Sequence, residues 1–222
     1  KGAVVMPLPT QGDVPIHYTL DGSEPTAASP RYTGPVEIGK SARFRATALR
    51  EGGENASYSR EFAFSKSTGR PAVLNTKPND SYTFEGASLL VDGYHSRPVF
   101  TSGAWLGYLD EPLDVTIDMG GEQSYRSVEL ETLAEKGDWI FPPSSVTVWV
   151  SDNGTDFTEV ASVAVPEAKA GDADGIGRYR MQFPETSARY LKVVAQNAAA
   201  IPAWHPGAGS KGFLFVDEVV VE

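Results

Sequence analysis

The chain has 222 residues and a formal net charge of −10 at pH 7. Hydrophobic residues make up 41% and charged residues 22% of it, a composition that excludes a disordered or low-complexity protein. Cysteine is absent, which excludes disulfides, thiolate nucleophiles and Cys-ligated metal sites, and no apolar run approaches the roughly 18 residues of a membrane span, so we expect no membrane insertion.

The excess of negative over positive charge lies entirely in the second part of the chain. Residues 1–66 carry 8 Lys and Arg against 7 Asp and Glu, a net charge of +1, whereas residues 67–222 carry 11 against 22, a net charge of −11. An acidic surface repels phosphate backbones and anionic lipids. We therefore expect no nucleic-acid partner, and neutral ligands or cations remain.

Four short segments of strand character predict a small β unit at the start of the chain. They are IHYTL at 16–20, PVEI at 35–38, ARFRATAL at 42–49 and YSREFAF at 58–64. The stretch that follows, SKSTGRP at 65–71, is polar and contains Gly and Pro, as is typical of a linker. We place a domain boundary there and predict domains at 1–66 and 67–222.

Apolar and polar residues alternate with period 2 in the second part, whereas helical periodicity is almost absent. In LDVTIDM at 113–119, Leu113, Val115 and Ile117 alternate with polar residues, and SVTVWV at 145–150 ends in SDNG, a hairpin signal. Further strand segments are DFTEVASV at 156–163, RYRMQF at 178–183, YLKVVAQ at 190–196 and FLFVDEVVVE at 213–222. Turn residues between short strands predict an all-β antiparallel sandwich.

The string YTLDGSEPT at 18–26, followed by Ser29, Tyr32 and Pro35, resembles the fibronectin III-associated module of chitobiases and β-hexosaminidases. The resemblance implies a small β-sandwich. We interpret the motif as a structural turn without a ligand, in which Asp21 and Gly22 reverse the chain and Pro25 stiffens its exit.

Residues 70–222 resemble a coagulation factor 5/8 type C (discoidin-like) domain, whose fold is shared with carbohydrate-binding module family 32. The resemblance implies a galactose-binding-like jelly-roll sandwich. The segments that carry it, in order, are LLVDG at 89–93, Trp105, LDVTIDMG at 113–120, SVEL at 127–130, PSSVTVWVSDNGTDFTEVA at 143–161, RYLKVV at 189–194 and FVDEVVVE at 215–222.

The segment IPAWHPGAGSKGFLFVDEV at 201–219 resembles the close of glycoside hydrolase family 20 β-N-acetylhexosaminidases from Bacteroidetes-type bacteria. With a first residue of Lys1, this implies the C-terminal region of a bacterial periplasmic, cell-surface or secreted enzyme, behind an upstream catalytic domain. That family uses an adjacent Asp-Glu pair on a TIM barrel. The pairs Asp110-Glu111 and Asp217-Glu218 lack its His and Gly-Gly context, so we expect no catalytic residue and no hydrolysis of aryl β-GlcNAc substrates.

Sugar binding requires an apolar ring for the C–H face of a pyranose and polar groups for its hydroxyls. Three segments combine the two, namely YHSRP at 94–98, KGDWIFPP at 136–143 and AWHPGAG at 203–209, and the module-32 resemblance implies that they lie at one end of the sandwich. We expect glycans with terminal GlcNAc or galactose-type sugars as partners. The candidate binding residues are Tyr94, His95, Arg97, Trp139, Trp204 and His205.

Other interpretations of these residues and of the chain stay open. Trp139, beside Ile140 and Phe141, is also compatible with a core position, and Trp204 with a plug beneath the sandwich. We interpret Trp105 and Trp149 as structural, because they lie in or beside strand pattern. Instead of binding glycans or bracing an upstream barrel, the chain could be a protein-binding adhesion or scaffold module, or its loops could complete the rim of an upstream active site.

The family resemblance also implies that the first and last strands of the sandwich are neighbours. Asp92 and Glu218 would then lie close together, with backbone carbonyls of the loop at 90–103 nearby. Hard oxygen ligands of this kind suit calcium. We therefore expect a structural Ca²⁺ at Asp92 and Glu218 and no other cofactor.

Overall fold

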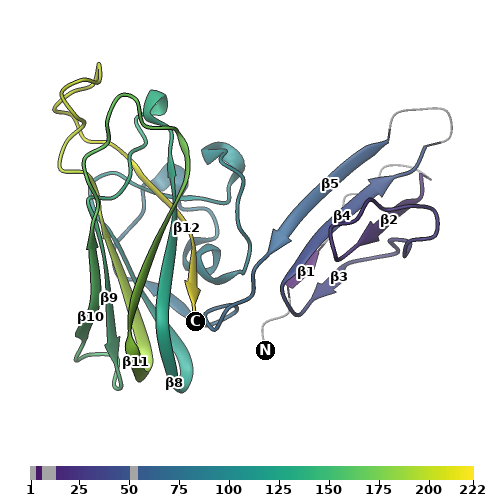
Figure 1. Cartoon of the computed structure of the whole chain (residues 1–222), viewed down its shortest axis with the longest axis horizontal. Helices are drawn as coiled ribbons and strands as arrows, with labels where there is room; N and C mark the ends of the chain where they lie inside the picture. Colours follow the sequence, from purple (N-terminus) through teal and green to yellow (C-terminus); the bar gives the residue numbers. More distant parts are fainter. Residues whose placement is uncertain (1–3, 7–13, 51–54) are drawn as a thin grey trace. The chain divides into compact units, whose positions relative to one another are not determined.

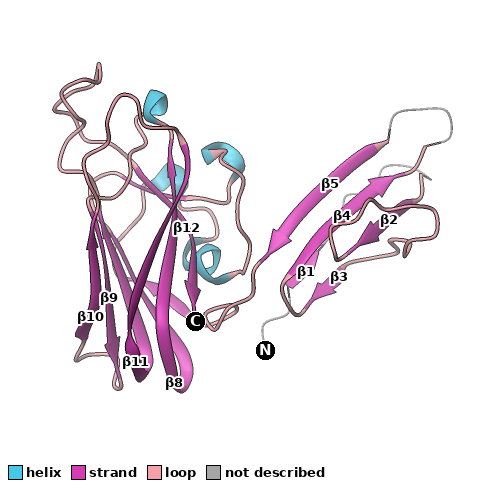
Figure 2. Ribbon diagram, viewed as in Figure 1, coloured by secondary structure: helices cyan, strands magenta, loops and turns pink. Residues whose placement is uncertain are grey.

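The computed structural model describes residues 4–6, 14–50 and 55–222. The chain divides into two compact units, one of Lys1–Phe64 with Gly93–His95 and one of Ser65–Asp92 with Ser96–Glu222. The described part of the first unit consists of β-strands and loops, and the second unit adds a few short 3₁₀ helices (Figure 1, Figure 2), which confirms the predicted all-β fold class.

The first unit is a small sandwich of two antiparallel sheets. One sheet has the order β2-β4-β5 and the other pairs β1 with β3. The strands are β1 (Val4–Met6), β2 (Ile16–Thr19), β3 (Val36–Ile38), β4 (Ala42–Ala48) and β5 (Ala56–Phe62). Ile38, Phe44, Ala46 and Phe62 form the core between the sheets. At the predicted turn after β2, Gly22 has a φ of 83° and Asp21 accepts a hydrogen bond from the Ser23 amide at 2.9 Å.

Two segments join units other than those that the sequence predicted. Ser65 and Lys66 belong to the second unit, because the Lys66 amide donates to the carbonyl of Val221 in the last strand at 3.0 Å. Gly93–His95 belongs to the first unit, because the Ala63 amide donates to the Gly93 carbonyl at 2.8 Å and Tyr94 bridges to Phe62 of β5. The first stretch of the first unit thus ends at Phe64, two residues before the predicted boundary.

The second unit is a sandwich whose two layers share the long strands β8 (Leu113–Ala134) and β11 (Gly175–Gln196). These strands pair along most of their length and turn over together at one end of the unit (Figure 1), where their register shifts between Gln182 and Thr186. The remaining strands are β6 (Ala72–Leu74), β7 (Leu106–Tyr108), β9 (Ser145–Ser151), β10 (Thr158–Ala164) and β12 (Leu214–Val221).

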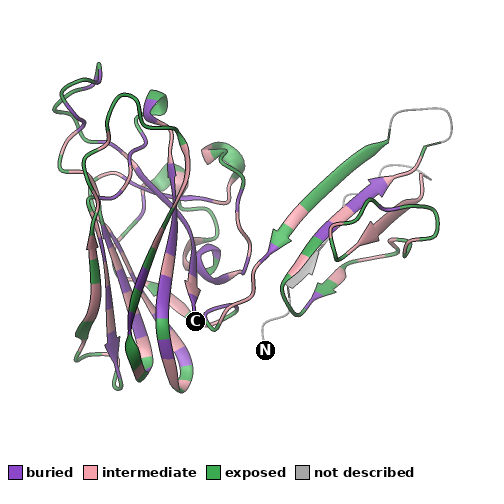
Figure 3. Ribbon diagram, in the orientation of Figure 1, coloured by how far each residue is buried: buried purple, intermediate pink, exposed green. Residues whose placement is uncertain are grey.

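The pairing partners define the two layers. In one, the second half of β11 lies between β9 and the first half of β8, with β10 and β6 at the edges. In the other, the second half of β8 lies between the first half of β11 and β12, with β7 at the edge. Fully buried side chains from both layers, such as Val115 and Val193 from one and Leu130 and Val219 from the other, meet in one hydrophobic core. The last strand is buried along nearly its whole length (Figure 3).

Most predicted strands of the second unit are present, but the structure joins some of them. RYRMQF and YLKVVAQ are two halves of β11, and LDVTIDM and SVEL both lie in β8, because the ladder continues across the turn between the layers. The predicted reversal at SDNG is present, but the connection between β9 and β10 covers residues 152–157 and is longer than a two-residue hairpin turn. Within it, the Asn153 side chain accepts from the Thr155 and Asp156 amides, both at 2.9 Å. The three-residue strands β1, β6 and β7 were not predicted, whereas β3, which has the same length, was.

The connections between the strands contain four short 3₁₀ helices in the described residues, namely η1 (Asp80–Tyr82), η2 (Gly86–Val91), η3 (Phe100–Ser102) and η4 (Lys136–Asp138). No helix in the described part of the chain is both long and apolar enough to cross a membrane. Trp105 is fully buried against Leu133, Ile140 and Phe215, which confirms its structural role, and its indole N–H donates to the Arg97 carbonyl at 2.9 Å.

A carboxylate stabilises the turn between the two layers. Asp118 accepts from the Arg189 guanidinium at 2.8 Å and from the Gly120 amide at 2.9 Å, and these bonds lower the pKa of Asp118 to about 2. Its unfolded pKa is about 3.9. A pKa lowered on folding stabilises the protein above the unfolded value, and the stabilisation is lost as the pH falls from about 4 to about 2.

We expect Asp118→Asn to lower the free energy of unfolding at pH 7 by about 1 kcal/mol, since solvent screens the partly exposed pair. Urea titrations at pH 7 and near pH 2 measure this, and the difference between variant and parent should vanish at the lower pH. Asp110→Asn, which removes the partner of an exposed lysine, Lys211, is the matched control and should change little. Equal stability of Asp118→Asn and parent at pH 7 would contradict the assignment.

Candidate functional site

Three loops of the second unit meet at the end of the sandwich opposite the turn of β8 and β11 (Figure 1). They are residues 135–144 between β8 and β9, residues 165–174 between β10 and β11, and residues 197–213 between β11 and β12. Each loop contains proline, which has no backbone N–H for a ladder. Backbone bonds tie the loops together, from Phe141 N to Phe213 O at 2.9 Å and from Val165 N to Ser144 O at 2.8 Å.

An aromatic cluster lies where these loops meet. His205 is its centre, since its ring lies edge-on to the rings of Trp139, Phe141 and Trp204 at centroid separations of 6.0, 5.5 and 5.5 Å. Phe141 and Trp204 also contact each other, at 6.3 Å. The structure therefore brings together three of the predicted binding residues, Trp139, Trp204 and His205.

His205 holds this cluster in place and is not free to bind a ligand. Its side chain is buried, and both ring nitrogens are engaged: Nδ1 accepts from the Gly207 amide at 3.0 Å, and Nε2 lies 2.9 Å from the Lys136 carbonyl. Because an amide only donates and a carbonyl only accepts, the proton lies on Nε2 and the ring is neutral. The prediction that His205 binds a sugar is corrected, since no ring nitrogen remains for a hydroxyl.

The two tryptophans of the cluster are partly exposed. Trp204 is 38% exposed, and its indole N–H donates to the Ala168 carbonyl at 2.9 Å, which fixes the orientation of the ring. Trp139 is 42% exposed, has a left-handed φ of 64° and packs closely over Gly207, where a Cβ would come within 2.9 Å of its ring. The core interpretation of Trp139 is therefore wrong, and both rings are available at the surface.

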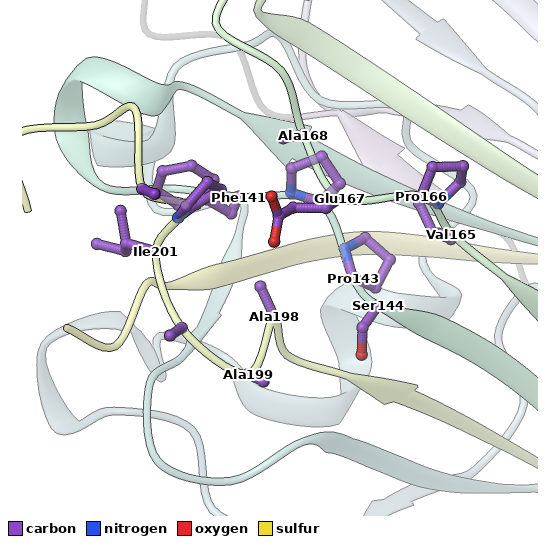
Figure 4. Close-up of a pocket in the computed structure, with 14 residues that line it drawn as sticks. Phe141, Pro143, Ser144, Val165, Pro166, Glu167, Ala168, Ala198, Ala199 and Ile201 are labelled. Atoms are coloured by element: carbon purple, nitrogen blue, oxygen red, sulfur yellow. The ribbon is translucent and has the colours of Figure 1, made fainter. Parts of the chain in front are cut away.

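A pocket of about 370 Å³ lies beside Trp204, whose ring contacts two of the lining residues, Phe141 and Ala168. All three loops line it, with apolar side chains such as Phe141, Pro143 and Ile201 (Figure 4). Glu167 is the one lining residue with a charged side chain, and its carboxylate points into the space near Ala198 (Figure 4). Sequence reasoning missed Glu167, because its neighbours Pro166 and Ala168 give no binding signal.

The other predicted binding residues lie elsewhere. Tyr94 and His95 belong to the first unit, where the Arg60 guanidinium covers the Tyr94 ring at 3.5 Å from its centroid. That face of Tyr94 is occupied, so it offers no platform to a sugar there. Arg97 is exposed in the second unit, and its carbonyl accepts from Trp105. Within the second unit, the structure thus gathers three of the six predicted residues, Trp139, Trp204 and His205.

The predicted calcium ligands lie in a region of buried acidic groups. Glu218 and its neighbour Asp217 are both buried, and Asp92 ends helix η2. Burial raises the pKa of Asp217 well above its usual value, and the Asp92 and Glu131 carboxylates raise it further, although the Ser96 amide donates to it at 2.8 Å. Within residues 4–6, 14–50 and 55–222, no three His, Cys, Asp or Glu side chains are grouped as a metal site.

Comparison with known families matches each unit of the chain separately. Residues 7–62 match the family described as Fn3 associated, and residues 75–211 match the F5/8 type C domain. The second match spans more than half of the chain. Among curated proteins, none is similar enough to the chain to count as a match.

Several solved structures are similar in fold to part of the chain. Chitosan-binding module 1 of a chitosanase/glucanase from Paenibacillus sp. IK-5 is 18% identical, covers 71% of this chain and 98% of its own, and has a TM-score of 0.46. Module 2 of the same enzyme, in complex with chitotriose, is 17% identical, covers 71% of this chain and 98% of its own, and has a TM-score of 0.46. CpGH89CBM32-5 from Clostridium perfringens, in complex with GalNAc-β-1,3-galactose, is 16% identical, covers 68% of this chain and 93% of its own, and has a TM-score of 0.45.

Proposed function

The chain belongs to the F5/8 type C domain family, and from that premise we propose that it is a non-catalytic carbohydrate-binding region that binds glycans weakly at the end of the second unit. The observation that carries the proposal is Trp204, a partly exposed ring fixed by its bond to Ala168 beside a 370 Å³ pocket. A ring that is already oriented loses little conformational entropy when a ligand binds.

The chemistry of the site suits a neutral sugar. The indole ring of Trp204 covers the C–H face of a pyranose, and the Glu167 carboxylate accepts hydrogen bonds from hydroxyls. The Ser144 hydroxyl donates to the Asn197 carbonyl at 2.9 Å, so its oxygen lone pairs remain as acceptors. One ring and a few hydrogen bonds correspond to a Kd on the order of 1 mM, or about −4 kcal/mol.

We propose terminal GlcNAc or galactose-type sugars as the ligands. Titration of the ¹⁵N-labelled chain with methyl glycosides of each sugar, followed by NMR, should shift the indole signal of Trp204 and the amide signals of residues 198–201 and 203. The same titration tests the rival function. If no sugar of the panel moves these signals at tens of millimolar, the glycan proposal fails, and a protein-binding scaffold module becomes the better interpretation.

We also propose that the chain is the C-terminal region of a secreted or periplasmic bacterial exo-β-N-acetylhexosaminidase, whose barrel it braces or helps to place on glycans. The closing segment 201–219 and the match of the first unit to the Fn3 associated family support this. The test is the sequence upstream of Lys1 in the genome, which should encode a strand ending in His, Gly-Gly and Asp-Glu. A different catalytic domain there would overturn the proposed context and leave glycan binding untouched.

We propose a structural calcium ion at Asp92 and Glu218, held by their carboxylates and by backbone carbonyls. An ion that binds only the folded state stabilises it by roughly 2.7 kcal/mol at a hundredfold excess over Kd. Such a gain raises the melting temperature by several degrees. The metal-stripped chain should therefore melt higher in millimolar calcium than in chelator.

Glu218→Gln should abolish this shift, whereas the control Glu159→Gln, which changes an exposed carboxylate, should retain it. Identical melting of the parent in calcium and in chelator would eliminate the site.

A further inference from the structure

The outer face of β9 and β11 carries a second hollow, distinct from the pocket beside Trp204. It has a volume of about 430 Å³. The residues that line it are Thr147, Trp149, Thr155, Phe157, Lys192, Val194 and Gln196. The ladder explains why they share a face, since Trp149 pairs with Lys192 and Thr147 with Val194, and directly opposed residues of neighbouring strands point to the same side. Their neighbours Val148 and Val193 point into the core.

Two aromatic rings and one cation meet in this hollow. The Lys192 ammonium lies over the Phe157 ring, 4.3 Å from its centroid, and Trp149 is the residue directly opposite Lys192 on β9. In the described part of the chain Lys192 Nζ has neither a hydrogen-bond acceptor nor an ion-pair partner. The Phe157 ring and the position of Lys192 on β11 therefore hold the ammonium group in place, and the three N–H donors of that group remain available to a ligand.

The remaining groups suit a sugar. The Trp149 and Phe157 rings are half-buried and offer apolar surface to the C–H face of a pyranose. Gln196 is exposed and brings an amide that both donates and accepts hydrogen bonds. Thr147 and Thr155 also line the hollow. The Thr155 hydroxyl donates to Asn153 Oδ1 at 2.9 Å, so its oxygen remains as an acceptor, and the Thr147 hydroxyl bonds to that of Ser162 at 3.0 Å.

The charges around the hollow limit the ligand further. Glu159 is opposed to Trp149 on β10, and Asp114 is opposed to Val194 on β8, so carboxylates flank the cation on both sides. Asp114 already accepts from the Asn75 side chain at 2.7 Å. Lys192 is thus a cation between carboxylates of the neighbouring strands, and the next cation along β11, Arg189, is already paired with Asp118 at 2.8 Å. This arrangement favours one anionic group and disfavours a polyanion.

We propose that this hollow is a second carbohydrate-binding site, specific for an acidic pyranose, in which Lys192 binds the carboxylate of a uronic acid and Trp149 and Phe157 contact its ring. The site stands on its own residues and does not depend on glycan binding beside Trp204.

The test uses a matched pair of ligands that differ only at C6, methyl β-D-glucuronide and methyl β-D-glucoside, titrated into the ¹⁵N-labelled full chain. The glucuronide should shift the Trp149 indole signal and the Lys192 and Gln196 amides with a Kd on the order of 1 mM, and the glucoside should bind at least about tenfold more weakly. Added salt should reduce the preference.

Variants assign the effect to the hollow. Lys192→Gln should abolish the preference for the glucuronide and Lys192→Arg should retain it, while Lys77→Gln, which removes an exposed lysine elsewhere in the unit, should change nothing. Trp204→Ala should also leave glucuronide binding intact, which separates this site from the one at the end of the sandwich.

Equal shifts with both glycosides, shifts confined to residues 198–205, or an unchanged preference in Lys192→Gln would each overturn the proposal, as would no shift at all. Should Lys192→Gln not fold, the Lys192→Arg variant and the salt dependence still decide the role of the charge.

Discussion

His205→Ala should lower the free energy of unfolding of the second unit by about 3 kcal/mol. The substitution removes a buried ring that contacts three others and leaves the Gly207 amide and the Lys136 carbonyl without their partner. Each buried polar group that loses its hydrogen bond costs about 1 to 3 kcal/mol, and the cavity left by the ring adds to this. Urea unfolding followed by tryptophan fluorescence measures the change.

Two further variants show whether the hydrogen bonds are the cause. His205→Asn keeps an acceptor near the position of Nδ1 for the Gly207 amide and should recover part of the loss. His17→Ala removes a histidine of the first unit and should leave the unfolding of the second unit unchanged. If His205→Ala were as stable as the parent and lost only sugar binding, His205 would be a ligand-binding residue, as the sequence predicted, and its role in holding the aromatic cluster would be refuted.

Trp204→Ala should have the largest effect on sugar binding, with at least a tenfold loss of affinity for the neutral glycan that binds best. Because the side chain is 38% exposed and has one hydrogen bond, to Ala168, its removal should leave the second unit folded, with a loss of about 1 kcal/mol. Stacking on an aromatic ring depends on the ring itself, so Trp204→Phe should retain part of the affinity. Calorimetric titration gives the affinities, and thermal melting checks the fold.

Phe84→Ala is the matched control, since it removes another exposed aromatic ring of the second unit, and it should leave the affinity unchanged. Unfolding of Trp204→Ala would show that Trp204 is part of the core, which is the alternative that the sequence left open. Full affinity in a folded Trp204→Ala would place the neutral-sugar site elsewhere. Together with His205→Ala, these outcomes separate the residue that contacts the ligand from the residue that positions it.

Local sequence signals determined the all-β class, most strands and the SDNG turn. The alternation in LDVTIDM identifies the first part of β8. In a strand with one buried face, apolar side chains recur at every second residue, and this period does not depend on which strand is its partner. The turn at SDNG is likewise local, since the Asn153 side chain bonds to amides two and three residues ahead. Candidate binding loops were also found this way, since Trp139, Trp204 and His205 do meet at one end of the second unit.

Tertiary contacts alone decided what each candidate does. His205 and Trp204 are adjacent in sequence, yet one is buried with both nitrogens bonded and the other is exposed beside a pocket, because their partners Lys136 and Ala168 come from loops far along the chain. Tyr94 joins the first unit through β5, some 30 residues earlier, for the same reason. The hollow of Trp149 and Lys192 exists only through the register of β9 with β11. Period and composition show which face a side chain takes along its own strand, but only the pairing of distant strands places two such faces side by side.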